Sequence, residues 1–211
     1  MKTTLTQNLR AAALIAALAT FAAAPAYGKE CKGINFRDQT QAGGTDVVLN
    51  GLGLRQATIM KVNVYVAALY VVQRSADASS ILASNSSKEL ILHFMRDVGG
   101  ADLSKGWQEG FENNAKGQLA ALKERIEKLK GLMADMKSGQ RLIFVAKPGA
   151  GVEVNVNGTV KGTIEGDDFS KAFLSIWLGA TPPNPGFENR TARRRLRLSV
   201  AAVADGMNGR S

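Results

Sequence analysis

The chain has 211 residues and a formal net charge of +9, with one cysteine and one histidine. These counts exclude an intramolecular disulfide and a conventional His/Cys metal cluster, and we expect neither a metal nor a cofactor. The leader (1–28) carries +2 and the residues from Gly186 onward carry +4, which leaves only +3 for the body. Because the charges of the body are mixed in sign, the high net charge does not indicate a nucleic-acid partner.

Residues 1–28 are predicted to be a cleaved signal peptide. A positively charged start precedes the uncharged run 11–24, and both Ala24-Pro25-Ala26 and Ala26-Tyr27-Gly28 have the small-residue spacing that signal peptidase needs. The run is too short to span a bilayer, which takes about 20 apolar residues. A buried N-terminal helix is the alternative, but the order of charge, apolar run and small residues favours a signal. We therefore expect a periplasmic or secreted protein.

The rest of the chain is predicted to be one domain (29–185) followed by an Arg-rich tail (186–211). Charged residues in Gly28-Lys29-Glu30 precede Cys31 where a lipidation signal needs small apolar residues, so no membrane anchor is expected after cleavage. The tail has no aromatic residue beyond Phe187 interleaved with its arginines, and no nucleic-acid module precedes it. We predict a disordered, solvated tail and no nucleic-acid partner.

Two strands, Asp46–Gln56 and Lys61–Val72, are predicted to form a hairpin, since both are rich in Val, Leu and Tyr. In the second strand, alternation separates two largely apolar faces: Val62, Val64, Val66, Ala68, Tyr70 and Val72 on one, and Asn63, Tyr65, Ala67, Leu69 and Val71 on the other. This pattern indicates an interior strand that is covered on both sides.

Helices and one strand are predicted between residues 75 and 137. A short surface helix lies within 75–87, and Glu89–Phe94 is a third strand. A helix then begins with Asp102 or Ser104 as its cap, and a second helix continues through 119–137 after a break near Gly117.

Three strands and a final helix are predicted after residue 140. Asn157-Gly158 supplies the positive backbone angles of a tight hairpin turn between two of the strands. The helix follows Gly166 with Asp167 or Asp168 as its cap, and the prolines of "ATPPNPG" end it. Hairpins dominate and no βαβ unit is present, so the sequence predicts an α+β fold with helices laid over an antiparallel sheet.

Other catalytic and binding motifs are weak or absent. His93 lies within "LILHFM", a position more typical of a packed strand residue than of a catalytic triad. Gly51-x-Gly53 lacks the third glycine and the helix of a dinucleotide fingerprint, and no phosphate-binding loop is present. Trp107 and Trp177 lie at helical spacing with other aromatic residues and are interpreted as core.

Arg55 and Tyr65 are the candidate site residues. If the hairpin turn centres on Met60, antiparallel partners have numbers that sum to 120, and Arg55 lies opposite Tyr65. A guanidinium and a phenol would then project close together from one face of the sheet. The alternative is structural: Arg55 pairs with a carboxylate at a strand end and Tyr65 packs in the core.

The sequence resembles the chalcone isomerase superfamily, and specifically its bacterial chalcone isomerase-like branch. The resemblance covers roughly residues 34–185 and rests on three blocks, "GLGLRQATIMKVNVYVAALYV", "LHFMRDV" before "GWQEGFENN", and "GVEVNVNGTVKGTIEGDDFSKAFLSIWLGATPP". It implies an open-faced β-sandwich, in which a large antiparallel sheet is backed by helices.

The resemblance also implies roles for the candidate residues. In plant members that close a chalcone into a flavanone, an arginine at the position of Arg55 holds the substrate, and a hydroxyl-bearing residue at the position of Tyr65 helps to polarise the ketone. Leu103 stands where those enzymes have a catalytic tyrosine. Noncatalytic fatty-acid-binding members use an arginine and a tyrosine to hold a carboxylate.

Three hypotheses follow. The first is an exported, noncatalytic protein that binds a small apolar carboxylate or phenolate through Arg55 and Tyr65. The second is an intramolecular lyase, classed as an isomerase, that closes a chalcone-like enone with the same two residues. The third is a structural or interaction protein with a closed pocket, in which Arg55 joins Arg96 and Asp97 in an internal ion network.

Overall fold

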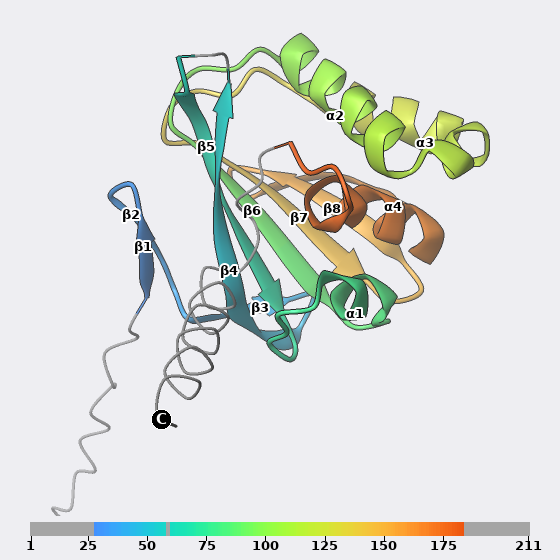
Figure 1. The fold of residues 1–211 in the computed structure, drawn as a ribbon, viewed down its shortest axis with the longest axis horizontal. Coiled ribbons are helices and arrows are strands. Elements are labelled where there is room, and N and C mark those ends of the chain that lie inside the picture. The colour runs from blue at the N-terminus through green and yellow to red at the C-terminus, as the bar shows by residue number, and fades with distance from the viewer. Residues whose placement is uncertain (1–27, 58–59, 184–211) are drawn as a thin grey trace, which may run out of the picture.

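The computed structural model describes residues 28–57 and 60–183, and it has an α+β fold (Figure 1). Seven strands form one antiparallel sheet in which each strand pairs with the next along the chain. Its strands are β3 (Gln39–Ala42), β4 (Thr45–Ala57), β5 (Val62–Val71), β6 (Lys88–Phe94), β7 (Arg141–Lys147), β8 (Gly151–Val156) and β9 (Thr159–Ile164). The predicted fold class, an open-faced sandwich of antiparallel sheet and helices, is confirmed.

Four α-helices and one 3₁₀ helix are present in the described part of the chain. They are α1 (Ala78–Ala83), α2 (Gly100–Asn114), η1 (Lys116–Gln118), α3 (Leu119–Gly131) and α4 (Asp167–Leu178). Figure 1 shows α2, α3 and α4 lying over the sheet. Their apolar faces meet alternate residues of β5, β6 and β7 in the main core, which includes Tyr65, Phe94, Phe111, Phe144 and Phe173.

The opposite face of the sheet is also covered. A short hairpin of β1 (Lys29–Cys31) and β2 (Ile34–Phe36) packs there, and Phe36 contacts the ring of His93 at a centroid distance of 6.5 Å. Strand β5 is therefore buried on both faces, as its sequence predicts. Strands β1, β2 and β3 were not predicted, because they are only three or four residues long, too short to show an alternating pattern.

The register of β4 and β5 brings the two candidate residues together. Arg55 lies directly opposite Tyr65, as predicted. The register then shifts, since Gln56 pairs with Asn63, and Val64 is the extra residue of a β-bulge. The bulge turns Val64 toward the helices, where it packs against the main core. The prediction that Val64 faces away from Tyr65 is therefore wrong.

The starts of two helices differ from the predictions. The residue that caps α2 is Gly99, and Asp102 lies in the first turn. Helix α4 is capped by Gly166, whose φ of 101° suits glycine, so Asp167 and Asp168 are its first residues and not its caps. Helix α3 ends at Gly131 and not near 137, because the chain turns to pair Met136 with Val98.

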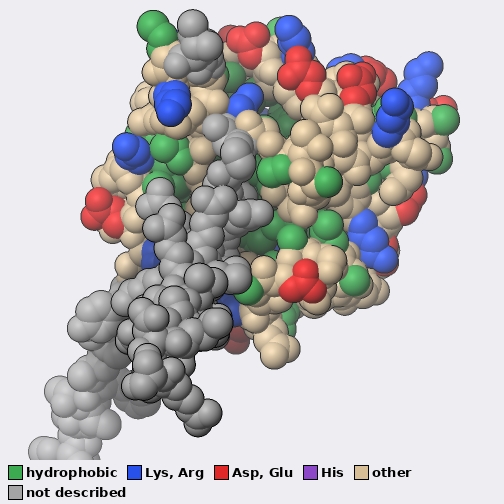
Figure 2. All heavy atoms as spheres, in the orientation of Figure 1, with side chains coloured by type: hydrophobic (Ala, Val, Ile, Leu, Met, Phe, Trp, Pro, Cys, Tyr) green, Lys and Arg blue, Asp and Glu red, His purple; other side chains and the backbone are tan. Residues whose placement is uncertain are grey.

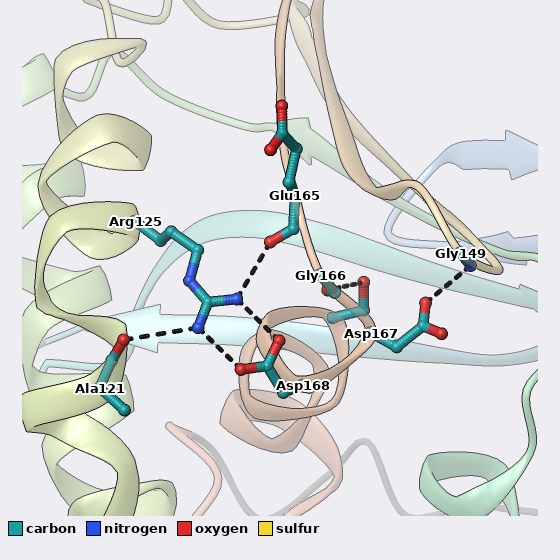
Figure 3. A network of polar contacts seen from close by, with 8 residues as sticks. Ala121, Arg125, Gly149, Glu165, Gly166, Asp167 and Asp168 are labelled. Carbon is teal, nitrogen blue, oxygen red and sulfur yellow. Dashed lines mark hydrogen bonds and ion pairs between the residues drawn. The ribbon is translucent and has the colours of Figure 1, made fainter.

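The two aspartates bind other segments (Figure 3). Asp168 accepts two hydrogen bonds of 2.7 Å from Arg125 of α3, and Asp167 accepts one of 2.9 Å from the backbone N–H of Gly149 in the β7–β8 turn. Arg125 holds the pKa of Asp168 down to about 2. The pair therefore ties the start of α4 to α3 and to the sheet.

Figure 2 shows positive and negative side chains dispersed over one face of the molecule.

Within residues 28–57 and 60–183, no helix has the length and apolar character to cross a membrane, and no group of three metal-binding side chains is found. The predicted signal peptide, apart from Gly28, and the predicted tail (186–211) lie outside the described residues.

Candidate binding site

A cleft of about 580 Å³ lies at the end of the β4–β5 hairpin, between the hairpin, helix α2 and the segment that follows α4. Arg55 and Tyr65 both line it. The remaining lining residues are Ala57, Val64, Arg96, Asp97, Val98, Asp102, Leu103, Gly106, Trp107, Glu109, Gly110, Asn113, Ile176, Thr181, Pro182 and Pro183. The volume lies within the range of small-molecule sites, which is about 300–1,000 Å³.

Arg55 is half-buried at the edge of this cleft. One terminal nitrogen of its guanidinium donates to the backbone carbonyls of Gln56 at 3.0 Å and of Pro183 at 2.7 Å. These contacts bring the last described residue of the chain onto the hairpin. They also hold the guanidinium beside the cleft.

Asp97 has partners outside the internal ion network suggested for it. Its carboxylate accepts from Lys137 at 2.9 Å and from the backbone N–H of Ser138 at 2.9 Å. Hydrogen bonds from Lys137 and Ser138 lower the pKa of Asp97, and the charge of Arg96 makes a smaller contribution in the same direction. Among the ion pairs of the described residues, none joins Asp97 to Arg55 or to Arg96. Asp97 therefore anchors the loop after α3.

Tyr65 is 7% exposed and lines the cleft. The hydroxyl oxygen accepts a hydrogen bond of 3.3 Å from the indole N–H of Trp177 in α4. Burial raises the pKa of Tyr65, although the Trp177 bond and the positive charge of Arg55 act in the opposite direction. The phenol is therefore neutral at physiological pH, and its own O–H is a donor.

One tryptophan lines the cleft and a second packs behind it. Trp107 of α2 lines the cleft, and its ring centroid lies 5.6 Å from that of Trp177. The indole N–H of Trp107 is buried, and it has no hydrogen-bond partner among the residues that the structure describes. Both rings belong to the main core, as their helical spacing predicts. The contribution of Trp107 to the cleft was not predicted.

The segment after α4 closes one side of the cleft. Asn114, at the end of α2, exchanges two hydrogen bonds with the backbone of Thr181, at 3.0 and 2.9 Å. Two residues further on, the carbonyl of Pro183 binds Arg55. The segment is thus held at two points, one on the helix layer and one on the sheet.

Comparison with known proteins places this architecture in a family. Residues 28–190 match the family model described as chalcone isomerase-like. The chain belongs to the chalcone isomerase-like family. Membership of its bacterial branch stays a prediction. A comparison with curated proteins finds no match.

Among solved structures, the chalcone isomerase-like domain is similar to the fatty-acid binding protein AtFAP1 of Arabidopsis thaliana. The TM-score is 0.59 at 16% sequence identity, and the similarity covers 77% of this chain and 90% of that protein. At this level of identity the similarity establishes a shared fold.

Within the chalcone isomerase-like domain, the sequence identified Arg55 and Tyr65, which both line the cleft, but it did not predict most of the other residues around them. Leu103, at the position where the resemblance implies a catalytic tyrosine in plant enzymes, lines the cleft and is 6% exposed. Trp177 reaches Tyr65 from 112 residues away, which no local pattern reveals. The prolines of "ATPPNPG" were interpreted only as a helix stop, yet Pro182 and Pro183 line the cleft.

Proposed function

We propose that this protein is a noncatalytic binding protein for a small apolar carboxylate or phenolate, such as a fatty acid. Arg55 is the anchor for the anion, and Tyr65 is a hydrogen-bond donor to it. One observation carries the proposal: the two residues face each other across β4 and β5, and both line a cleft of about 580 Å³.

The chemistry of the pair suits an anionic head group. A guanidinium has five N–H donors in a planar fork that matches a carboxylate, and the neutral phenol of Tyr65 adds a further donor. Arg55 donates to the backbone carbonyls of Gln56 and Pro183, and a carboxylate would add an opposite charge and two oxygens that the planar fork can bind together. An anion is therefore a favourable partner for this part of the cleft.

The apolar part of the ligand would lie against Val64, Leu103, Trp107 and Ile176, which also line the cleft. Burial of apolar surface contributes about 25 cal/mol per Å², so an acyl or aryl group adds affinity in proportion to the area it covers. The shared fold with a protein named as fatty-acid binding supports this class of ligand.

The two alternative functions are less well supported. An intramolecular lyase needs donors directed at the enolate oxygen, and Leu103 provides no hydroxyl at the position where plant enzymes have a tyrosine. A rate of 2′-hydroxychalcone cyclisation above the buffer background would favour that enzyme. A structural protein with a closed pocket is disfavoured because the cleft reaches Tyr65.

The proposed location is the periplasm or the cell exterior. The support is the order of charge, apolar run and small residues within 1–28. N-terminal sequencing of the mature protein from fractionated cells tests this, with cleavage after Ala26 or Gly28 expected. An intact N-terminus on cytoplasmic protein contradicts it.

The proposed function is tested by titrating the protein with dodecanoate. Arg55→Ala is expected to weaken binding by about 1.5–3 kcal/mol, or roughly 10- to 150-fold, because it removes a hydrogen bond to a charged group. Arg55→Lys keeps the charge but loses the fork, so an intermediate loss is expected. Calorimetry or the intrinsic fluorescence of the two tryptophans gives the dissociation constants.

Arg141→Ala is the matched control. Arg141 lies on β7 and donates to His93 at 3.2 Å, and its removal lowers the net charge by the same amount as Arg55→Ala. The control is expected to bind as the wild type does. Equal affinity in Arg55→Ala and the wild type would falsify the assignment of Arg55 as the anchor.

A further inference from the structure

Helix α2 has two glycines on the wall of the cleft, and they differ in their surroundings. A Cβ placed on Gly110 would lie 2.7 Å from Cγ2 of Ile176, so this glycine is required by the close packing of α2 on α4. A Cβ placed on Gly106, one turn earlier, would meet no atom within 4 Å. Packing therefore explains Gly110 and does not explain Gly106.

Gly106 lies in the interior of a helix of 15 residues. Glycine there destabilises a helix relative to alanine, because it loses more backbone freedom on folding and adds no side-chain contact. Its backbone conformation is the ordinary helical one, so no positive φ requires glycine. What glycine provides at this position is space, and that space belongs to the cleft.

The neighbours of Gly106 give this space its chemical character. Leu103 and Trp107, on either side of it along α2, line the cleft and are 6% and 4% exposed. The wall of the cleft is thus apolar at both of these residues, and at the exposed Gly106 it ends at the helix backbone, because no side chain stands there. We call the space beside Gly106 the recess. Asp102 and Glu109 line the cleft one turn away on either side, so a chain that passes through the recess would lie between these carboxylates, against Leu103 and Trp107.

We propose that Gly106 determines the size of the apolar group that the cleft accepts, with an unbranched acyl chain running along α2 through the recess. This inference rests on the proposed function, and it adds a residue that sets specificity for chain length. A side chain at position 106 would occupy the recess and leave room only for shorter ligands.

The test is a series of saturated fatty acids from hexanoate to hexadecanoate, followed by tryptophan fluorescence. Wild-type affinity is expected to rise about fourfold per added methylene until the cleft is filled. Gly106→Leu is expected to bind hexanoate as the wild type does, to stop gaining affinity several methylenes earlier, and to bind dodecanoate at least tenfold more weakly.

Gly131→Leu is the matched control. Gly131 is also a helical glycine with no atom within 4 Å of an added Cβ, but it ends α3 and does not line the cleft. The control is expected to follow the wild type at every chain length. Gly106→Ala is a milder second variant, expected to melt at a slightly higher temperature and to lose affinity only for the longest acids.

Different outcomes separate this inference from the proposed function. If the wild type binds the acids and both Gly106 variants match it at every length, Gly106 does not set specificity, while the proposed function stands. If the wild type binds no acid, the proposed function fails for fatty acids as its ligands. The recess is then probed with the anionic dye 8-anilinonaphthalene-1-sulfonate, which fluoresces more strongly in apolar surroundings. Gly106→Leu must reduce this fluorescence enhancement if the recess is open. An unchanged enhancement overturns the inference.

Discussion

Two tyrosines of β5, five residues apart and on opposite faces of the sheet, show how the same side chain serves different purposes. Tyr70 donates its hydroxyl proton to the backbone carbonyl of Arg37 at 2.9 Å, and burial raises its pKa to about 12. Tyr65 accepts from Trp177 and lines the cleft beside Arg55. The O–H of Tyr70 thus donates to a group of the fold, whereas the O–H of Tyr65 is a donor at the wall of the cleft.

The face of Tyr70 also holds an acidic residue. Glu89 lies opposite Tyr70 in the β5–β6 pair and is 7% exposed, and one of its carboxyl oxygens has no hydrogen-bond partner in the part of the chain described. Glu89 does not line the cleft. A buried polar group therefore suggests a binding site only where a cavity and a complementary charge lie beside it.

The largest expected effect on stability concerns Glu89. Burial raises its pKa from 4.5 to about 7, so the folded state keeps a proton that the unfolded chain loses. The free energy of unfolding should therefore fall as the pH rises from about 4.5 through 7, by roughly 1–3 kcal/mol. Glu89→Gln should remove this part of the pH dependence, as urea unfolding at pH 5 and pH 8 would show.

His93 also contributes to the pH dependence of the free energy of unfolding. Because it is present in both Glu89→Gln and the wild type, its contribution cancels in the difference between them. Burial and the charge of Arg141 lower the pKa of His93, which gives a slope of the opposite sign near pH 6.5. Arg37, Asp38 and Arg141 influence Tyr70 on the same face and are unchanged in both proteins. Parallel pH profiles for the variant and the wild type would show that Glu89 is not a proton-binding group of the fold.

Effects of intermediate size are expected for the two tyrosines, with one variant affecting stability and the other affecting binding. Tyr70→Phe should lower the free energy of unfolding by about 0.5–1.5 kcal/mol, because the carbonyl of Arg37 loses its donor, and dodecanoate binding should not change. Tyr65→Phe should weaken dodecanoate binding by a similar free energy, with a smaller effect on unfolding. If both variants weakened dodecanoate binding equally, Tyr65 and Tyr70 would not differ in their roles.

The smallest effect is expected for an ion pair near the surface. Arg125 and Asp168 have side chains that are 28% and 56% exposed, so solvent screens their interaction. Arg125→Ala should lower the free energy of unfolding by about 1 kcal/mol or less. This contribution is present above pH 3.8, the ordinary pKa of aspartate, and is lost as the pH falls through about 2. Added salt should reduce the difference between variant and wild type.

The sequence predicted the features that depend on local pattern. Alternation in β5 and the Asn157-Gly158 turn, with φ values of 50° and 86°, gave the antiparallel sheet and a hairpin as observed. Numbering about Met60 gave the Arg55–Tyr65 pair, although the two pairs nearest the turn have numbers that sum to 119, and the bulge at Val64 restores the predicted register at Arg55. The blocks of family resemblance gave the architecture.

The remaining features depend on contacts between distant segments. The bulge at Val64 moves one residue to the other face, and neither its position nor its effect follows from alternation. The caps of α2 and α4 are glycines, so the aspartates beside them were assigned a role that they do not have. The bonds from Trp177 to Tyr65 and from Arg55 to Pro183 join residues more than 100 positions apart.

The contact between Arg55 and Pro183 has a thermodynamic consequence. The same guanidinium that is proposed to hold the ligand also holds Pro183, in the segment that follows α4. Docking of that segment and occupancy of the cleft are therefore linked equilibria, and each alters the other by the same factor. Loosening the segment at Asn114 then becomes a way to tune affinity without altering any group that touches the anion.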